Sequence, residues 1–180
     1  MPLILQVAGT AAAWVVLFEL NSWFFASFEW TRLINWVFLP AGARLLSVMA
    51  LGRRGALGLW LGAMVTNRTA FNAPLGQSLT VATLSAGAPL IAVYVGMRWL
   101  KVPLGLHGLT AGQLMKFALL GAACSVVLHN LFFWAVGIES NPLQGLAPMF
   151  VGDLIGTFLV LYTLHAALLI IERFVRIPTP

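Results

Sequence analysis

The segment LAPMFVGDLIGTFLVLYTLHAALLIIERF, residues 146–174, contains one charged residue, Asp153, before its last three positions. An apolar run of this length with so few charges is long enough to cross a bilayer as an α-helix. Its apolarity is continuous and does not alternate at every second residue. The segment therefore predicts a membrane helix rather than a strand of a membrane β-barrel.

Five further apolar segments precede it in the chain. They cover residues 3–25, 33–51, 55–66, 78–99 and 111–136. We therefore predict an all-α fold, a polytopic integral membrane helical bundle of about six transmembrane segments, with residues 1–180 forming a single transmembrane domain. The segment 55–66 is short for a full span, so we expect it to be tilted, to extend into its flanks or to be partly re-entrant.

The overall composition agrees with a membrane protein. Of the 180 residues, 61% are hydrophobic and 8% are charged, whereas soluble domains carry roughly 25% charged residues. Six spans leave little chain for an extramembrane catalytic domain. The net charge of +5 comes from basic residues in the connections between apolar segments. This pattern is typical of membrane orientation, so we expect no binding to nucleic acid.

Basic residues are distributed unequally between the two sides of this arrangement. The connections on one side carry Arg53, Arg54, Arg98, Lys101, Arg173 and Arg176. The connections on the other side carry Arg32 and Arg68, together with Glu29 and Glu139. Cytoplasmic connections of membrane proteins are enriched in Lys and Arg. We therefore expect both termini to be cytoplasmic.

Several polar residues lie within the apolar segments, at one depth in the outer third of the membrane. They are Glu19, Arg44, His129, Asn130 and Asp153. Charged groups inside a span are costly and usually face the bundle interior or a wet cavity. Two interpretations stay open: a ligand or ion pocket open to the extracytoplasmic side and centred on Arg44, or a buried ion pair that only fixes helix register.

Arg44 needs a carboxylate partner in either interpretation, and Asp153 and Glu19 are the acids at a reachable depth. We expect Asp153 to be the partner because Gly152 and Gly156 allow its helix to approach closely. We also expect Pro40 and Gly42 to interrupt the segment 33–51, and the Gly87–Pro89 tripeptide to interrupt the segment 78–99.

Motifs for catalysis, metals or cofactors are absent from the sequence. The predicted depths of His129 and His165 differ by roughly 10 Å or more at 1.5 Å per residue, which is too far for the two axial ligands of one haem. No HxxxH, HxxE or CxxC spacing occurs within a predicted helix, and neither HExxH nor a nucleophile elbow is present. We expect no cofactor, no metal and no enzymatic activity.

Two short patches carry a resemblance to a known family. The first is WVFLPAG at residues 36–42, followed by Gly52 and by GLWLG at residues 58–62; the second is FVGDLIG at residues 150–156. From about residue 35 to 161, the sequence resembles the bacterial membrane-associated sensor domain of the first MASE family, whose final span carries a similar GDxxG pattern. The resemblance implies a helical input module in the bacterial inner membrane that signals through a cytoplasmic domain. The chain is shorter than the usual module, and the proline that often follows the final helix turn of the family is absent. We expect it to act on a separate partner, another membrane or signalling protein.

Two other functions fit six apolar helices. One is the substrate-binding membrane component of an energy-coupling-factor vitamin uptake transporter, because residues 8–12 (AGTAA) are similar to the small-residue docking face of such components. The other is an accessory structural subunit of a larger membrane complex. A bound small-molecule ligand would favour the transporter, and a tight co-purifying complex would favour the subunit. Membrane lipids are expected partners in every case.

Overall fold

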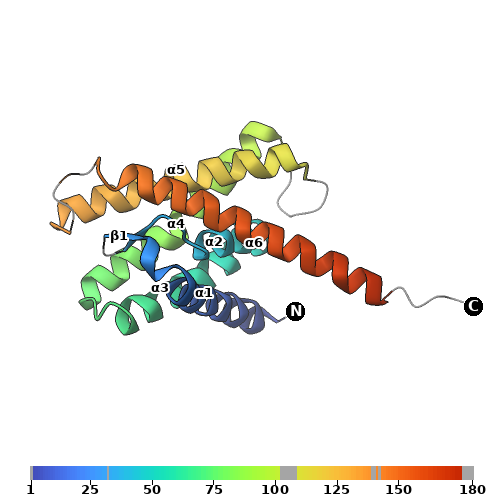
Figure 1. Ribbon diagram of the computed structural model, residues 1–180, viewed down its shortest axis with the longest axis horizontal. Helices are drawn as coiled ribbons and strands as arrows, with labels where there is room; N and C mark the ends of the chain where they lie inside the picture. Colours follow the sequence, from blue (N-terminus) through green and yellow to red (C-terminus); the bar gives the residue numbers. More distant parts are fainter. Residues whose placement is uncertain (1, 32, 102–108, 139–140, 142, 176–180) are drawn as a thin grey trace, which may run out of the picture.

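The computed structural model describes residues 2–31, 33–101, 109–138, 141 and 143–175, apart from the side chains at 169 and 172–175. Arg32, Glu139 and Arg176, and the side chain of Arg173, lie outside this description. The described helices are α1 (Leu3–Phe25), α2 (Pro40–Leu51), α3 (Arg53–Thr69), α4 (Leu75–Leu100), α5 (Ala111–Ala135) and α6 (Leu146–Val175) (Figure 1). The short helical turn η1 (Ala26–Phe28) and the strands β1 (Glu29–Thr31) and β2 (Ile34–Asn35) connect α1 to α2.

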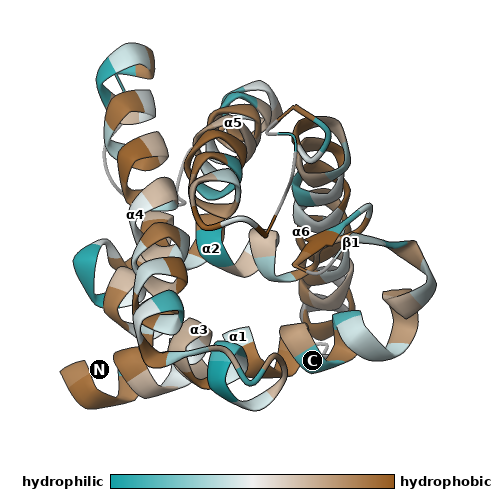
Figure 2. Ribbon diagram, turned by 90° about the vertical axis from the view of Figure 1, so that its left-hand side faces the viewer, coloured by the Kyte–Doolittle hydropathy of each residue, from teal (hydrophilic) through white to brown (hydrophobic). Residues whose placement is uncertain are grey.

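The all-helical prediction is confirmed across the described residues. Helices α1, α4, α5 and α6 are long and apolar enough to cross a membrane, and hydrophobic residues predominate along them (Figure 2). Helices α2 and α3 have 12 and 17 residues. At 1.5 Å per residue they reach about 18 and 26 Å, less than the ~30 Å of a hydrocarbon core.

The segment 33–51 is helical only from Pro40 onward, so the expected interruption is in fact the start of α2. Proline suits the first position of a helix because its fixed φ is helical and its missing N–H is not needed there. The residues before it include the strand β2 and are not part of a helix. Phe38 N donates to the carbonyl of Gly152 at 3.0 Å, and Leu39 N donates to Asn21 Oδ1 at 2.7 Å. These bonds satisfy backbone groups that lipid could not.

The expected interruption at Gly87–Pro89 is wrong, because α4 is continuous with Pro89 inside it. Proline is tolerated within membrane helices where neighbouring helices cover the freed backbone, and Pro89 is buried. The segment 55–66 was expected to be tilted, to extend into its flanks or to be partly re-entrant. The structure shows extension into the flanks, since α3 runs from Arg53 to Thr69. Gly52 joins α2 to α3 with φ 57°, a conformation that favours glycine.

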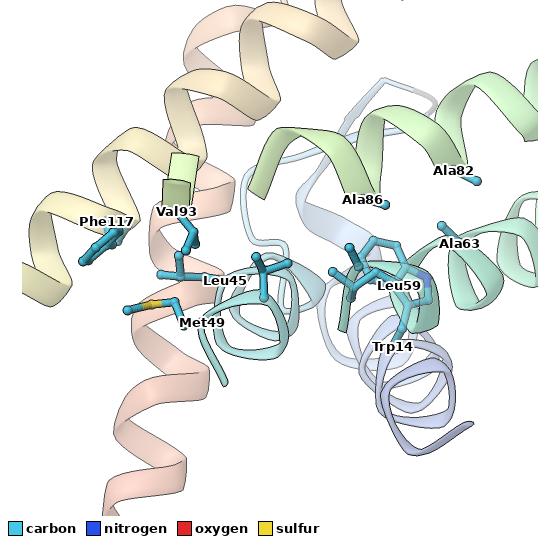
Figure 3. Close-up of a cluster of buried hydrophobic side chains, with 12 residues drawn as sticks. Trp14, Leu45, Met49, Leu59, Ala63, Ala82, Ala86, Val93 and Phe117 are labelled. Atoms are coloured by element: carbon cyan, nitrogen blue, oxygen red, sulfur yellow. The ribbon is translucent and has the colours of Figure 1, made fainter. Parts of the chain in front are cut away.

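The shortest helix, α2, lies at the centre of the bundle and packs against each of the other five helices. Helices α1 and α3 run parallel to each other, with Gly58 against Thr10 and Gly62 against Trp14. A Cβ at either glycine would overlap the facing side chain, so these glycines permit the close contact that their spacing predicts. Figure 3 shows the buried hydrophobic cluster that extends from α1 to α5, in which Trp14, Leu59 and Phe117 are fully or nearly buried.

The helix ends form two groups. The N-terminus and the C-terminal end of α6 lie toward one end of the molecule, on the right of Figure 1. The β1–β2 hairpin and the connection from α5 to α6 lie toward the opposite end. We call the latter the hairpin end, and it is the end nearest the polar residues described next.

Candidate ligand-binding cavity

Arg44 and Asp153 form a buried ion pair between α2 and α6. Arg44 Nη2 lies 2.6 Å from Asp153 Oδ1, and the two side chains are 5% and 3% exposed. The predicted pairing is therefore confirmed, and Asp153 is the partner rather than Glu19, which is exposed on α1. The pair joins two helices that are far apart in the sequence.

Two glycines allow α6 to pack closely against the non-helical segment that precedes α2. A Cβ at Gly152 would overlap the carbonyl of Asn35, and a Cβ at Gly156 would overlap the carbonyl of Phe38. Only glycine allows a helix to lie this close to another backbone. The close approach carries Asp153 to the guanidinium of Arg44.

The guanidinium is also held by α1 and α5. Arg44 Nη1 donates to Ser125 Oγ at 2.7 Å. Its central carbon lies 5.1 Å from the ring centre of Phe38 and 6.0 Å from that of Trp14. Trp14 is itself fixed, because its Nε1 donates to Thr66 Oγ1 at 3.1 Å. Ionic, hydrogen-bonding and cation–π contacts thus give Arg44 one orientation.

His129 lies one helical turn after Ser125 on α5. Its Nδ1 donates to the carbonyl of Ser125 at 2.8 Å, since a carbonyl can only accept. In the neutral ring, Nε2 then accepts from the hydroxyl of Ser85 on α4 at 3.3 Å. The ring therefore links α4 to α5 beside the ion pair.

A cavity of about 330 Å³ opens among these groups, and residues of all six helices and of both strands line it. Glu19, Arg44, His129 and Asp153 all line it, so four of the five predicted site residues meet in one place. Other lining residues used below are Phe18, Glu29, Asn67, Phe71, Val81 and Phe133. The volume lies at the lower end of the range for small-molecule sites.

Asn130, the fifth predicted residue, does not line this cavity. Its Nδ2 donates to the carbonyl of Val126 at 3.0 Å and to Met149 Sδ at 3.3 Å. Consecutive residues of a helix point in directions about 100° apart, so Asn130 faces α6 while His129 faces the cavity. Asn130 thus lies apart from the other four predicted site residues.

Several residues that line or support the cavity were not predicted as site residues, notably Trp14, Asn21, Asn67, Ser85 and Ser125. Two of them carried a usable signal. Ser125 is four residues before His129, which places both side chains on one helix face. Asn21 is a polar residue within an apolar span, and such residues usually face the bundle interior.

The described residues contain no group of three His, Cys, Asp or Glu side chains that could hold a metal ion. Comparison of the chain with protein-family models, with curated proteins and with solved structures found no match.

Proposed function

We propose that the protein is a non-enzymatic, multi-pass membrane module of the sensor type that binds a small molecule in the cavity around Arg44. The observation that carries this proposal is the cavity itself. Residues of all six helices line it, and the buried ion pair of Arg44 and Asp153 forms part of its wall. A concave site with a few oriented polar groups among apolar side chains is the usual form of a small-molecule site.

The same ion pair connects the cavity to α6, the helix through which we propose that a partner protein senses the ligand. A guanidinium has five N–H groups, and two of them donate to Ser125 and Asp153. A ligand that contacts Arg44 changes the strength of its bond to Asp153 and hence the seating of α6. Helix α6 leads away from the cavity to the opposite end of the molecule (Figure 1). We propose that a membrane or signalling partner contacts α6 at that end and responds to a change in the position of the helix.

We further propose six membrane segments, with both termini cytoplasmic, in the bacterial inner membrane. The non-helical apolar residues before α2 add to the 12 residues of that helix, which supports a crossing made by the two together. The exposed Arg53 and Arg54 begin α3, and the exposed Arg98 and Lys101 lie at the C-terminal end of α4, away from the hairpin end. Basic residues favour the cytoplasmic side, which places the cavity mouth outside.

Thiol labelling tests this orientation. The single cysteine, Cys124, is first replaced by alanine, and Arg54→Cys and Leu143→Cys are then made separately. Leu143 is 70% exposed at the hairpin end, so we expect a membrane-impermeant maleimide to label Leu143→Cys in intact spheroplasts. Arg54→Cys is expected to react only after permeabilisation. Reaction of both from the same side would contradict the six-segment arrangement.

A second labelling experiment tests the property that the proposed function requires, access of water to the cavity. Val81 lines the cavity on α4, whereas Leu79 is 39% exposed two residues away on the same helix and does not line it. In the Cys124→Ala background, we expect Val81→Cys to react at least about tenfold faster than Leu79→Cys, because a thiol against lipid rarely ionises to the reactive thiolate. Equal, slow reaction of both would refute a ligand cavity and favour a structural subunit.

A further inference from the structure

We infer that the ligand of this cavity is a small organic cation that carries N–H donors, such as a primary amine or an amidine. The inference rests on the proposed function, that the cavity binds a small molecule. Three separate features of the described residues carry it: the balance of charges, an acceptor without a partner, and the aromatic lining.

The charges around the cavity are unbalanced. Its lining contains the carboxylates of Glu19, Glu29 and Asp153 but one guanidinium, that of Arg44. Arg44 is already matched by Asp153 at 2.6 Å. Within the described part of the chain, neither Glu19 nor Glu29 takes part in a salt bridge. Among the described residues, two carboxylates at the cavity therefore have no salt-bridge partner, and a cleft lined by one sign of charge concentrates ions of the opposite sign.

Asn67 adds an acceptor at a fixed position. The residue is 4% exposed and lines the cavity. Its Nδ2 donates to the carbonyl of Ala63 at 2.8 Å, which sets the orientation of the amide. Among the described residues, its Oδ1 has no hydrogen-bond partner. A buried acceptor left unsatisfied is costly, so an N–H group of a ligand that reached this oxygen would be stabilised there.

The aromatic lining also favours a cation. Phe18 and Phe71 contact each other edge to face with their ring centres 5.7 Å apart, and Phe133 lines the same cavity. Aromatic faces attract cations and repel anions. An anionic ligand would instead meet these faces and two carboxylates, and would have to compete with Asp153 for Arg44.

Two thiol reagents of similar size and opposite charge test the inference. The purified Val81→Cys/Cys124→Ala chain, in phosphatidylcholine nanodiscs, is treated with trimethylammonioethyl methanethiosulfonate or with sulfonatoethyl methanethiosulfonate. The ratio of the two rates is divided by the same ratio for Leu143→Cys. We expect the cationic reagent to be favoured at least about tenfold in the cavity. Adding Glu19→Gln and Glu29→Gln is expected to abolish most of this preference, whereas Lys116→Gln, outside the cavity, is expected to leave it unchanged.

Protection from the uncharged reagent methyl methanethiosulfonate then tests binding. Putrescine, succinate and butanediol have the same carbon chain length but are cationic, anionic and neutral. We expect putrescine to slow the modification of Val81→Cys saturably, and the other two compounds to have no effect. A melting curve of each variant verifies that it is folded.

The outcomes separate the two proposals. Equal normalised rates for both charged reagents would leave the cavity open but overturn the inference of a cation. A preference for the anionic reagent, protection by succinate, or no protection by putrescine up to millimolar concentration would also overturn it. If neither charged reagent reacts at Val81→Cys, the cavity is closed, and the proposed function fails together with the inference.

Discussion

Replacing Arg44 by methionine is expected to destabilise the protein by about 3–5 kcal/mol, and so is replacing Asp153 by leucine. Each change leaves one charge without its partner, and both side chains are at most 5% exposed. The double variant is expected to lose much less than the sum of the two, because an apolar pair of similar volume leaves no buried charge behind.

Unfolding free energies of the two single variants and the double variant, measured in one detergent, form a double-mutant cycle. Arg54→Met is the matched control, because it removes an exposed arginine whose Nη1 donates to Gln6 Oε1 at 3.1 Å. Exposed polar contacts contribute little, so we expect this control to lose about 1 kcal/mol or less. Strictly additive losses for Arg44 and Asp153 would mean that the pair does not interact.

Gly152→Ala and Gly156→Ala are expected to be nearly as damaging, at about 3 kcal/mol each, the upper end of the usual cost of overpacking. The added methyl group would overlap a backbone carbonyl, of Asn35 in the first case and of Phe38 in the second. A flexible side chain could move aside, but this backbone is held by the hydrogen bonds of Phe38 and Leu39. The new methyl group therefore forces α6 outward.

Gly76→Ala and Gly87→Ala are the matched controls, since both lie in α4 and a Cβ at either position meets no atom within 4 Å. Alanine is the better helix former, so these two variants are expected to be neutral or more stable by up to about 1 kcal/mol. Thermal unfolding of all four variants compares them directly. Similar losses at the four positions would contradict the close packing of α6 on the segment before α2.

The long helices could be predicted from the sequence, but the segment before α2 could not. The bounds of α1, α5 and α6 follow from continuous apolar runs that are too long for buried strands. Residues 33–39 belong to such a run as well, yet they form no helix, and Ile34–Asn35 form a strand. A short buried strand and a buried helical turn have the same apolar pattern, and the partners that decide between them, Asn21 and Gly152, lie in other helices.

Counting depth along each span predicted the site in part. It placed Glu19, Arg44, His129 and Asp153 in one layer, and the structure places all four at the cavity. Depth alone does not say which way a side chain faces, so it could not show that Asn130 faces α6 while His129 faces the cavity. Asn67 was missed because it follows the predicted end of its segment, whereas α3 continues to Thr69.

The non-helical backbone before α2 has a consequence for biogenesis. A nascent helix of 12 residues that carries an arginine is too short and too polar to be released into lipid alone. The carboxylate that neutralises Arg44 is synthesised 109 residues later, and the carbonyl that accepts from Phe38 belongs to the residue just before it. In the proposed six-segment arrangement, insertion of α2 is therefore completed only after Gly152 and Asp153 of α6 have emerged from the ribosome.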